Sequence, residues 1–163
     1  MWFKVVDGRL RAGLKWPTMF RGRFDYTIDE KGRTSLPAKF REVLSANYDE
    51  RLILTTFDNC LWAYPVKEWS VIEEKIAALP QFKAEVKALQ RVFVSGAVEC
   101  PLDKQGRIVI PPTLRDYAGL KKDILFVGMT KRIEIWSKEK WSEVFTAAQA
   151  RIDGSEDLAN LGL

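Results

Sequence analysis

The sequence predicts an α+β fold in which two tandem β-β-α-β-β-α repeats interlock into one pseudo-twofold β-barrel with outer helices. Three observations support this fold class. A thirteen-residue motif occurs twice, the same order of apolar patterns follows each copy, and neither half alone could bury both faces of its four short strands. Interlocking the two halves gives every strand a partner and every apolar face a cover.

The repeated motif reads D-x-x-G-R, three residues, Pro, three residues, Arg. Its first copy runs from Asp29 to Arg41 and its second from Asp103 to Arg115, an offset of 74 residues. In both copies a large apolar residue precedes the Pro and another precedes the last Arg. Self-similarity of this kind at a fixed offset indicates an internal duplication.

The first repeat opens with alternating apolar residues between positions 23 and 28, which predict a half-buried strand. Asp29 to Gly32 is typical of a tight turn, because Asp can accept hydrogen bonds from the following backbone and Gly tolerates a positive φ. A short strand over residues 33–36 follows. Pro37 then suits the first turn of a helix, because its missing N–H needs no partner there.

Two further strands, residues 52–54 and 61–64, are predicted on either side of Asp58-Asn59. Pro65 begins a longer helix that Pro80 ends. A second helix continues to Ser95-Gly96, so the two helices form a connecting hairpin. The residues expected on the buried sides of this pair are Trp69, Ile72, Ile76, Leu79, Phe82, Val86, Leu89 and Phe93.

The second repeat follows the same order. Strands are predicted near residues 98–102, 108–110, 124–127 and 133–136, and the later ones match the first repeat at an offset of 72. Gly119 is expected to end the short helix in a left-handed conformation. The last helix carries Trp141, Val144 and Phe145 on its apolar side.

These patterns divide the chain into five segments. Residues 1–18 show no periodicity and have no counterpart in the repeat, so we interpret them as an N-terminal extension before a start at Met19, with a phosphate-contacting basic arm as the alternative. The remaining segments are the first repeat, a connecting helix, the second repeat and a polar tail expected to fray, at residues 19–80, 81–94, 95–152 and 153–163.

The composition excludes most kinds of catalytic site. The chain has no histidine, which excludes Ser-His-Asp and Cys-His nucleophile systems and His-ligated metal sites. It has no glycine-rich nucleotide loop and no apolar run of about 20 residues that could span a bilayer. Cys60 and Cys100 fit no disulfide or metal spacing and indicate reduced core residues. We therefore expect no enzyme activity, cofactor, metal or small-molecule substrate, with a carboxylate pair of Asp29 and Asp103 as the remaining enzymatic alternative.

The net charge of +4 is unevenly distributed. Residues 1–18 contribute +3, so the rest of the chain is close to neutral. Within it, residues 19–41 hold six Lys/Arg against three Asp/Glu, and residues 102–122 hold five against two. Both copies of the motif are thus local basic regions, which points to the motif rather than to the whole chain as the anion-binding part.

The candidate binding residues lie in the two turns. Lys31 and Arg33, then Lys104 and Arg107, form two basic hairpins, and two-stranded ribbons of this kind fit the major groove of DNA. Turn formation is assigned to the Asp and Gly residues of the motif, namely Asp29, Gly32, Asp103 and Gly106. An equally open alternative is that each motif arginine only forms an ion pair with the Asp four positions earlier, which would contribute little to stability.

Arg41 and Arg115, at the end of each motif copy, lie on the predicted short helices beside apolar positions. Either could reach a phosphate group. Pairing in a buried or interfacial position is the interpretation that their neighbours favour.

The duplicated D-x-x-x-R motif, the start Met19-Phe20-Arg21-Gly22 and the segment from Asp103 to Leu120 closely resemble the MraZ family of bacterial transcriptional regulators, whose fold is related to AbrB-type swapped-hairpin domains. The resemblance covers about residues 19–152. It implies a cytoplasmic, nucleoid-associated protein that forms a ring of subunits and binds tandem repeats in double-stranded promoter DNA. It further implies an autoregulatory role, most simply repression, at the division and cell-wall gene cluster. A ring-shaped protein-interaction scaffold with basic tips is the alternative function.

Overall fold

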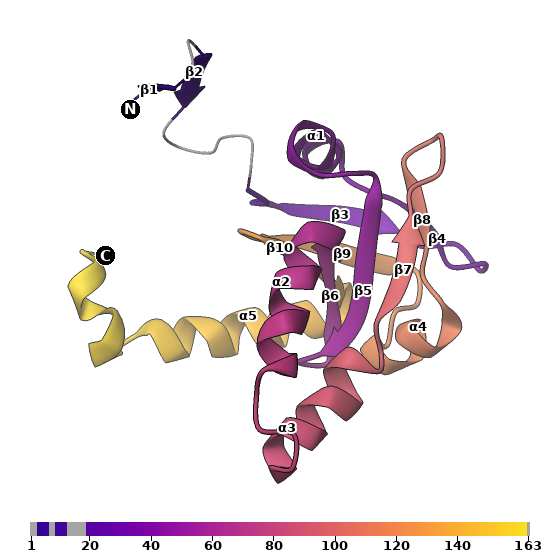
Figure 1. Cartoon of the computed structure of the whole chain (residues 1–163). Coiled ribbons are helices and arrows are strands. Elements are labelled where there is room, and N and C mark those ends of the chain that lie inside the picture. The colour runs from indigo at the N-terminus through magenta and orange to yellow at the C-terminus, as the bar shows by residue number, and fades with distance from the viewer. Residues whose placement is uncertain (1–2, 7–8, 13–18, 163) are drawn as a thin grey trace.

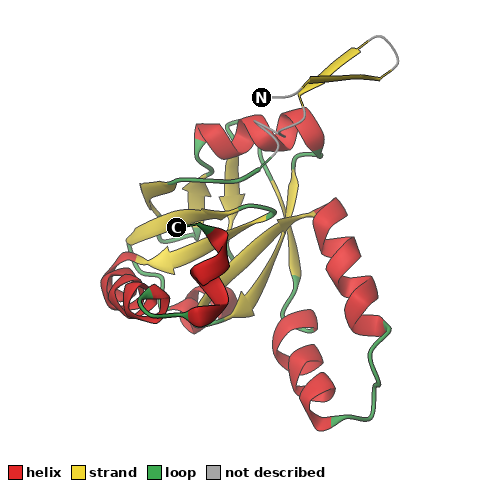
Figure 2. Ribbon diagram, turned by 90° about the vertical axis from the view of Figure 1, so that its left-hand side faces the viewer, coloured by secondary structure: helices red, strands yellow, loops and turns green. Residues whose placement is uncertain are grey.

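The computed structural model describes residues 3–6, 9–12 and 19–162, with side chains described from residue 19 onward. Strands and helices alternate as the duplicated pattern predicts, and the helices lie around the outside of the strands (Figure 1, Figure 2). The strands are β1 Phe3–Val6, β2 Arg9–Ala12, β3 Arg23–Thr27, β4 Arg33–Ser35, β5 Arg51–Phe57, β6 Cys60–Pro65, β7 Val98–Pro101, β8 Arg107–Val109, β9 Asp123–Met129 and β10 Arg132–Ser137. The helices are α1 Ala38–Asn47, α2 Val66–Ala77, α3 Ala84–Leu89 with a π-helical turn η1 Gln90–Val94, α4 Pro112–Ala118, α5 Lys138–Ile152 and a 3-10 helix η2 Glu156–Leu161.

The two repeats exchange strands. An antiparallel sheet has the order β3-β9-β10-β6-β5-β7, so β3 of the first repeat pairs with β9 of the second, and β7 of the second pairs with β5 of the first. Strands β4 and β8, one from each repeat, form a separate two-stranded ribbon. The fold is therefore mixed α+β with two interlocked repeats.

The pseudo-twofold axis can be located from the strand register. At the centre of the large sheet Trp62 lies opposite Glu134, and these are equivalent positions at the 72-residue offset. In the ribbon Thr34 lies opposite Ile108, which are equivalent at the 74-residue offset. Residues paired with their own equivalents must lie on the axis, so it passes through the middle of both sheets.

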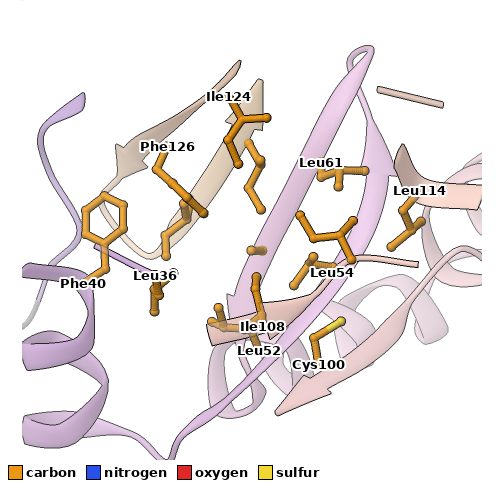
Figure 3. Close-up of a cluster of buried hydrophobic side chains, with 14 of the residues drawn as sticks. Leu36, Phe40, Leu52, Leu54, Leu61, Cys100, Ile108, Leu114, Ile124 and Phe126 are labelled. Atoms are coloured by element: carbon orange, nitrogen blue, oxygen red, sulfur yellow. The ribbon is translucent and has the colours of Figure 1, made fainter. Parts of the chain in front are cut away.

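One main core lies between the sheet, the ribbon and helices α1 and α4, and both repeats contribute to it (Figure 3). Leu36, Leu54, Ile108, Ile124 and Phe126 are fully buried in it. A second cluster contains Trp136 with the partly buried Trp141 and Val144 of α5, and a third contains Tyr64, Trp69 and Phe93 on the side of α2 and η1. Trp69 and Trp141, which the sequence predicts on the apolar sides of their helices, are thus both used for packing.

Two residues expected on the buried side of the connecting helices are exposed. Helix α2 ends at Ala77, and Pro80 disfavours helical geometry in the residue directly before it, Leu79. Leu79 is therefore outside the helical spacing and is 41% exposed. Phe82 lies in the loop before α3 and is 93% exposed.

Both ends of the chain contain more regular structure than expected. Within residues 1–18 the backbone of β1 pairs with that of β2, from Phe3↔Ala12 to Val6↔Arg9, where no periodic element was predicted; the rest of that segment lies outside the described residues. The tail, expected to fray, contains the short helix η2. Among the described residues no helix is long and apolar enough to cross a bilayer.

Candidate nucleic-acid interface

The first motif turn is organised by the carboxylate of Asp29. Its Oδ1 accepts hydrogen bonds from the backbone N–H groups of Lys31 (3.0 Å) and Arg33 (2.9 Å), and its Oδ2 accepts one from Arg33 Nε (2.7 Å). Gly32 has φ +83°, a conformation that a Cβ disfavours. Its N–H donates to the carbonyl of Asp29 (3.0 Å). Asp29 and Gly32 therefore have the turn-forming roles that the motif predicts.

The second turn repeats this geometry. Asp103 Oδ1 accepts from the N–H groups of Gln105 (2.8 Å) and Arg107 (2.9 Å), and Oδ2 accepts from Arg107 Nε (2.9 Å). Gly106 has φ +74°. The two ion pairs expected between Asp and Arg four positions apart are both present. They lie at the surface, where such pairs contribute little to stability.

The electrostatics of the two carboxylates do not favour a catalytic pair. The hydrogen bonds that Asp29 accepts from the backbone and side chain of Arg33 lower its pKa, and the backbone N–H of Arg107 does the same for the pKa of Asp103. Two carboxylates that share a proton would instead raise the pKa of one of them. Each carboxylate here is used inside its own turn.

The ribbon of β4 and β8 places both motif arginines on one face. Arg33 lies opposite Val109 and Arg107 lies opposite Ser35, so the two arginines are diagonal neighbours. Diagonal neighbours in an antiparallel pair are about 7–8 Å apart and point to the same side. The other face of the ribbon, made by Thr34 and Ile108, is buried in the core. One face of the ribbon is thus anchored and the opposite face presents two cations to solvent.

Each arginine keeps part of its guanidinium available. The side chains of Arg33 and Arg107 are 41% and 36% exposed. Within the described part of the chain, only Nε of each guanidinium is engaged, by its own Asp. The terminal Nη groups can therefore donate to a further acceptor, while the Asp holds the guanidinium in a fixed direction.

The arginines lie at the first residues of β4 and β8 rather than at the turn tips, where we expected them. The tips carry Glu30 and Lys31 in the first turn and Lys104 and Gln105 in the second, all exposed. Lys31 and Lys104 are therefore not equivalent: Glu30 occupies the position of Lys104, and Gln105 that of Lys31. Figure 1 shows both turns extending from the side of the molecule where β4 and β8 lie.

Each turn is held by the opposite repeat. The N–H of Ile110 donates to the carbonyl of Gly32 (2.8 Å), and the N–H of Leu36 donates to the carbonyl of Gly106 (2.9 Å). A Cβ on Gly32 would overlap the carbonyl oxygen of Ile110. The glycines are needed for close approach between the repeats as well as for their positive φ.

Arg41 and Arg115 lie at the contact between the repeats, the interfacial position that their neighbours favour, and neither forms an ion pair among the described residues. Arg115 is half-buried and donates from Nε to the carbonyl of Ile110 (3.0 Å) and from Nη1 to the carbonyl of Glu30 (3.3 Å). Arg41 is exposed, and its guanidinium lies against Gly106. Glu30 and Gly106 belong to the opposite turns, whereas Ile110 lies in the same repeat as Arg115, and no pattern in the sequence specifies these partners.

Both cysteines are buried in the part of the chain described. Cys60 and Cys100 are buried free thiols, as predicted, and burial raises the pKa of both, that of Cys100 to about 11. A thiol of this kind is a poor nucleophile at neutral pH. No group of three or more His, Cys, Asp or Glu residues is placed to hold a metal ion among the described residues.

Comparison with known proteins matches this duplicated architecture. The model of the family MraZ, described as "MraZ protein, putative antitoxin-like", matches twice, over residues 19–92 and 93–161. The chain belongs to the MraZ family. The two matches of the MraZ model correspond to the two repeats that exchange strands in the structure.

Three relatives share about half of their residues with this chain. A protein of Desulfitobacterium hafniense (strain Y51) is 49% identical over 147 residues, covering 89% of this chain and the whole of the relative. One from Caldanaerobacter subterraneus subsp. tengcongensis is 51% identical over 77% of this chain and 85% of its own length. One from Natranaerobius thermophilus is 47% identical over 83% of this chain and 92% of its own length. All three are named "Transcriptional regulator MraZ".

Proposed function

We propose that this chain is a transcriptional regulator that binds double-stranded DNA through the exposed face of the β4–β8 ribbon. The observation that carries the proposal is the position of Arg33 and Arg107, which are diagonal neighbours on that face with free Nη groups. The naming of the relatives as transcriptional regulators supports it.

A two-stranded ribbon has the width to enter the major groove of B-DNA. There an arginine can donate two hydrogen bonds to the O6 and N7 atoms of a guanine, or contact a phosphate. Asp29 and Asp103 hold Nε of the two arginines, so the guanidinium groups enter the groove already oriented and lose less conformational entropy on binding.

The fold supports this use because the ribbon is not free to move. Its buried face packs in the main core through Thr34 and Ile108, and the turns that flank it bond to the opposite repeat through Gly32 and Gly106. We propose that this strand exchange closes into a swapped-hairpin barrel of the AbrB type. In it, residues 19–80 and 95–152 are the two repeats and residues 81–94 connect them.

One subunit presents few cations, and a protein with few phosphate contacts binds DNA weakly at physiological salt. We therefore propose that several copies assemble, most simply in a ring, and that each contacts one of several direct repeats in a promoter. Linked contacts multiply affinity through effective concentration. The finer role, autoregulatory repression of the division and cell-wall cluster by a cytoplasmic, nucleoid-associated protein, is the function that the family resemblance implies.

Fluorescence anisotropy with Arg33→Ala, Arg107→Ala and the double variant tests the proposal, on duplex DNA from upstream of the gene and on a shuffled duplex. Each single substitution should weaken binding about 5- to 150-fold, the value of one bidentate arginine contact. Circular dichroism and unfolding should change little, because both ion pairs are exposed. Arg151→Ala, an exposed arginine on α5, is the matched control and should bind normally.

Unchanged affinity in both motif variants would contradict the proposal. Equal affinity of the wild-type protein for the upstream DNA, the shuffled DNA and heparin would instead favour the alternative, an interaction scaffold that binds any polyanion through its basic turns. Titration of DNA with and without the direct repeats, at two salt concentrations, separates these two functions. The presence of the repeats should raise the affinity only of a protein that recognises DNA sequence.

A further inference from the structure

A second basic region lies where β9 begins and β10 leads into α5. Its residues surround a surface cavity of about 380 Å³. We call it the lysine corner, and it consists of Lys121, Lys122, Asp123, Ser137, Lys138 and Glu139. Three lysines face two carboxylates there, so the lining carries a net positive charge.

The N-terminus of α5 adds to this positive potential. A helix of this length has backbone N–H groups in its first turn without intrahelical partners, and its dipole favours an anion at that end. The N-cap residue is Ser137, but its side chain makes no capping hydrogen bond. Ser137 is 5% exposed as a residue and lines the cavity, and no hydrogen bond of its hydroxyl is found among the described residues. A hydroxyl without a partner beside a helix N-terminus is available to an anionic acceptor.

The lysines of the corner are largely uncommitted. Lys138 Nζ contacts Asp25 Oδ1 at 3.0 Å, and both side chains are more than half exposed. Within the described residues Lys121 and Lys122 take part in no ion pair, and both are exposed. An anion in the cavity could therefore be met by at least two ammonium groups without breaking a buried interaction.

The equivalent corner of the first repeat has a different charge pattern and no net positive charge. At the 72-residue offset Asp49 and Glu50 replace Lys121 and Lys122, Arg51 replaces Asp123, and Pro65 replaces Ser137. Arg51 is already bound to Asp49 (2.5 Å) and to Glu99 (3.0 Å). The first-repeat corner has Val66 at the position of Lys138 and a single exposed lysine, Lys67, at that of Glu139, so it lacks both the group of three lysines and the hydroxyl at the helix N-terminus.

The strand exchange places each corner beside a motif turn. The carbonyl of Lys122 accepts a hydrogen bond from the N–H of Ile28 (2.9 Å), the residue before Asp29. In the same way the carbonyl of Glu50 accepts from the N–H of Leu102 (2.9 Å), the residue before Asp103. The first turn is thus flanked by the lysine corner and the second by the acidic one.

We propose that the lysine corner binds a phosphate group, and that in the complex with DNA this is a backbone phosphate next to the bases contacted from the first turn. The second turn has no such contact, so the two turns of one subunit bind DNA unequally. The DNA part of this inference rests on the proposed function, whereas binding of a phosphate group at the corner does not.

The first experiment uses inorganic phosphate without DNA. Phosphate is titrated into ¹⁵N-labelled protein while the backbone amide signals of Lys138 and Glu139 are followed by NMR. Saturable shifts are expected at these amides, and Lys121→Gln/Lys122→Gln should weaken the apparent affinity at least about 5-fold. Ser137→Ala should also weaken it. Lys75→Gln, an exposed lysine on α2, is the control and should behave as wild type.

The second experiment measures DNA affinity against salt concentration for the same variants. Each phosphate contact contributes about 0.9 to the slope of log K against log salt. In Lys121→Gln/Lys122→Gln the magnitude of this slope should fall by about 0.9, equally on specific and shuffled DNA. In Lys75→Gln the slope should not change.

The outcomes are distinguishable. An unchanged slope in the double lysine variant, with DNA still bound and phosphate shifts present, would overturn the DNA part and leave free phosphate as the ligand. Absence of saturable shifts together with an unchanged slope would overturn the whole inference. Failure of the wild-type protein to bind DNA would refute the proposed function and the DNA part with it, and the phosphate titration would still decide the corner.

Discussion

The two motif turns have the same backbone and different surfaces. Both place Asp as acceptor of two N–H groups and of an arginine Nε, and both use Gly at positive φ. Between these fixed positions the first turn carries Glu30 and Lys31, and the second carries Lys104 and Gln105. Residues that set the geometry are the same in the two copies, whereas residues that face outward differ. One duplicated scaffold therefore presents two chemically different tips.

The two turns also differ in the contacts that hold them in place. Arg115 donates to two carbonyls around the first turn, and Gly32 lies against the backbone of Ile110. Gly106 of the second turn lies against the side chain of Arg41, which is exposed and free to move aside. The first turn is thus the more tightly held of the two, although their hydrogen-bond lengths are nearly the same.

Alanine at the two motif glycines should produce the largest difference between the turns. An L-residue at such a positive φ costs about 1–2 kcal/mol, and overpacking against a fixed neighbour costs about 1–3 kcal/mol more. Gly32→Ala should therefore lower the free energy of unfolding by about 3 kcal/mol, and Gly106→Ala by about 1–2 kcal/mol. Urea unfolding followed by tryptophan fluorescence measures both.

Gly154→Ala isolates the conformational part of this effect. Gly154 has φ +77°, and nothing lies within 4 Å of the Cβ that alanine would add. Gly154→Ala should therefore lower the free energy of unfolding by the conformational cost alone, about 1 kcal/mol. Equal destabilisation by Gly32→Ala and Gly106→Ala would show that contact with the opposite backbone does not distinguish the turns.

A smaller and opposite effect is expected on the pseudo-twofold axis, where Thr34 faces its own equivalent Ile108. Thr34 is 2% exposed, and its hydroxyl has no hydrogen-bond partner in the described structure. An unsatisfied buried hydroxyl costs free energy that an apolar group of the same shape avoids. Thr34→Val should raise the free energy of unfolding by about 1 kcal/mol. Thr34→Ser, which keeps the hydroxyl and loses the methyl group, should destabilise; a destabilised valine variant would mean that the hydroxyl is in fact bonded.

The loss of folding stability at acidic pH should depend on both turns. Hydrogen bonds lower the pKa of Asp29 and of Asp103 in the folded protein. A lowered folded pKa stabilises the protein above the pKa of the unfolded chain, about 3.9, and this stability is lost as pH falls through the folded pKa. Unfolding free energy should therefore decline below about pH 5.

The double variant Asp29→Asn/Asp103→Asn should show a shallower decline over the same range. Part of the slope should remain, because Arg51 lowers the pKa of Asp49 as well. Urea unfolding at intervals from pH 7 to pH 2 measures the profile. A slope identical to that of the wild-type protein would contradict the roles assigned to these two carboxylates.

Much of the fold follows from the sequence because duplication makes local signals repeat. The Asp and Gly of each turn, the left-handed cap at Gly119 and the apolar spacing of the strands all act over a few residues, and the structure confirms them. The interlocking of the repeats also follows, because each half alone would leave apolar strand faces uncovered.

The features that the sequence does not predict depend on contacts between residues far apart in the chain. The register that makes Arg33 and Arg107 diagonal neighbours is set by pairing across 74 residues, and nothing local specifies it. One carbonyl partner of Arg115, that of Glu30, belongs to the opposite repeat. The lysine corner does have a signal in the sequence, because Asp49 and Glu50 of the first repeat correspond to Lys121 and Lys122 at the 72-residue offset.

The tip lysines should give the smallest effects, and these should again be unequal. Lys31→Gln and Lys104→Gln remove exposed charges, so each should change the free energy of unfolding by less than about 0.5 kcal/mol. Lys31 is adjacent to Glu30, which forms no ion pair among the described residues and offsets its charge, whereas the acidic neighbour of Lys104 is Asp103, which is already paired with Arg107. Lys104→Gln should therefore weaken DNA binding at low salt more than Lys31→Gln does, with Lys75→Gln as control. A larger loss in Lys31→Gln would mean that the first tip lies closer to phosphate than the second, and that position in the complex outweighs the local charge balance.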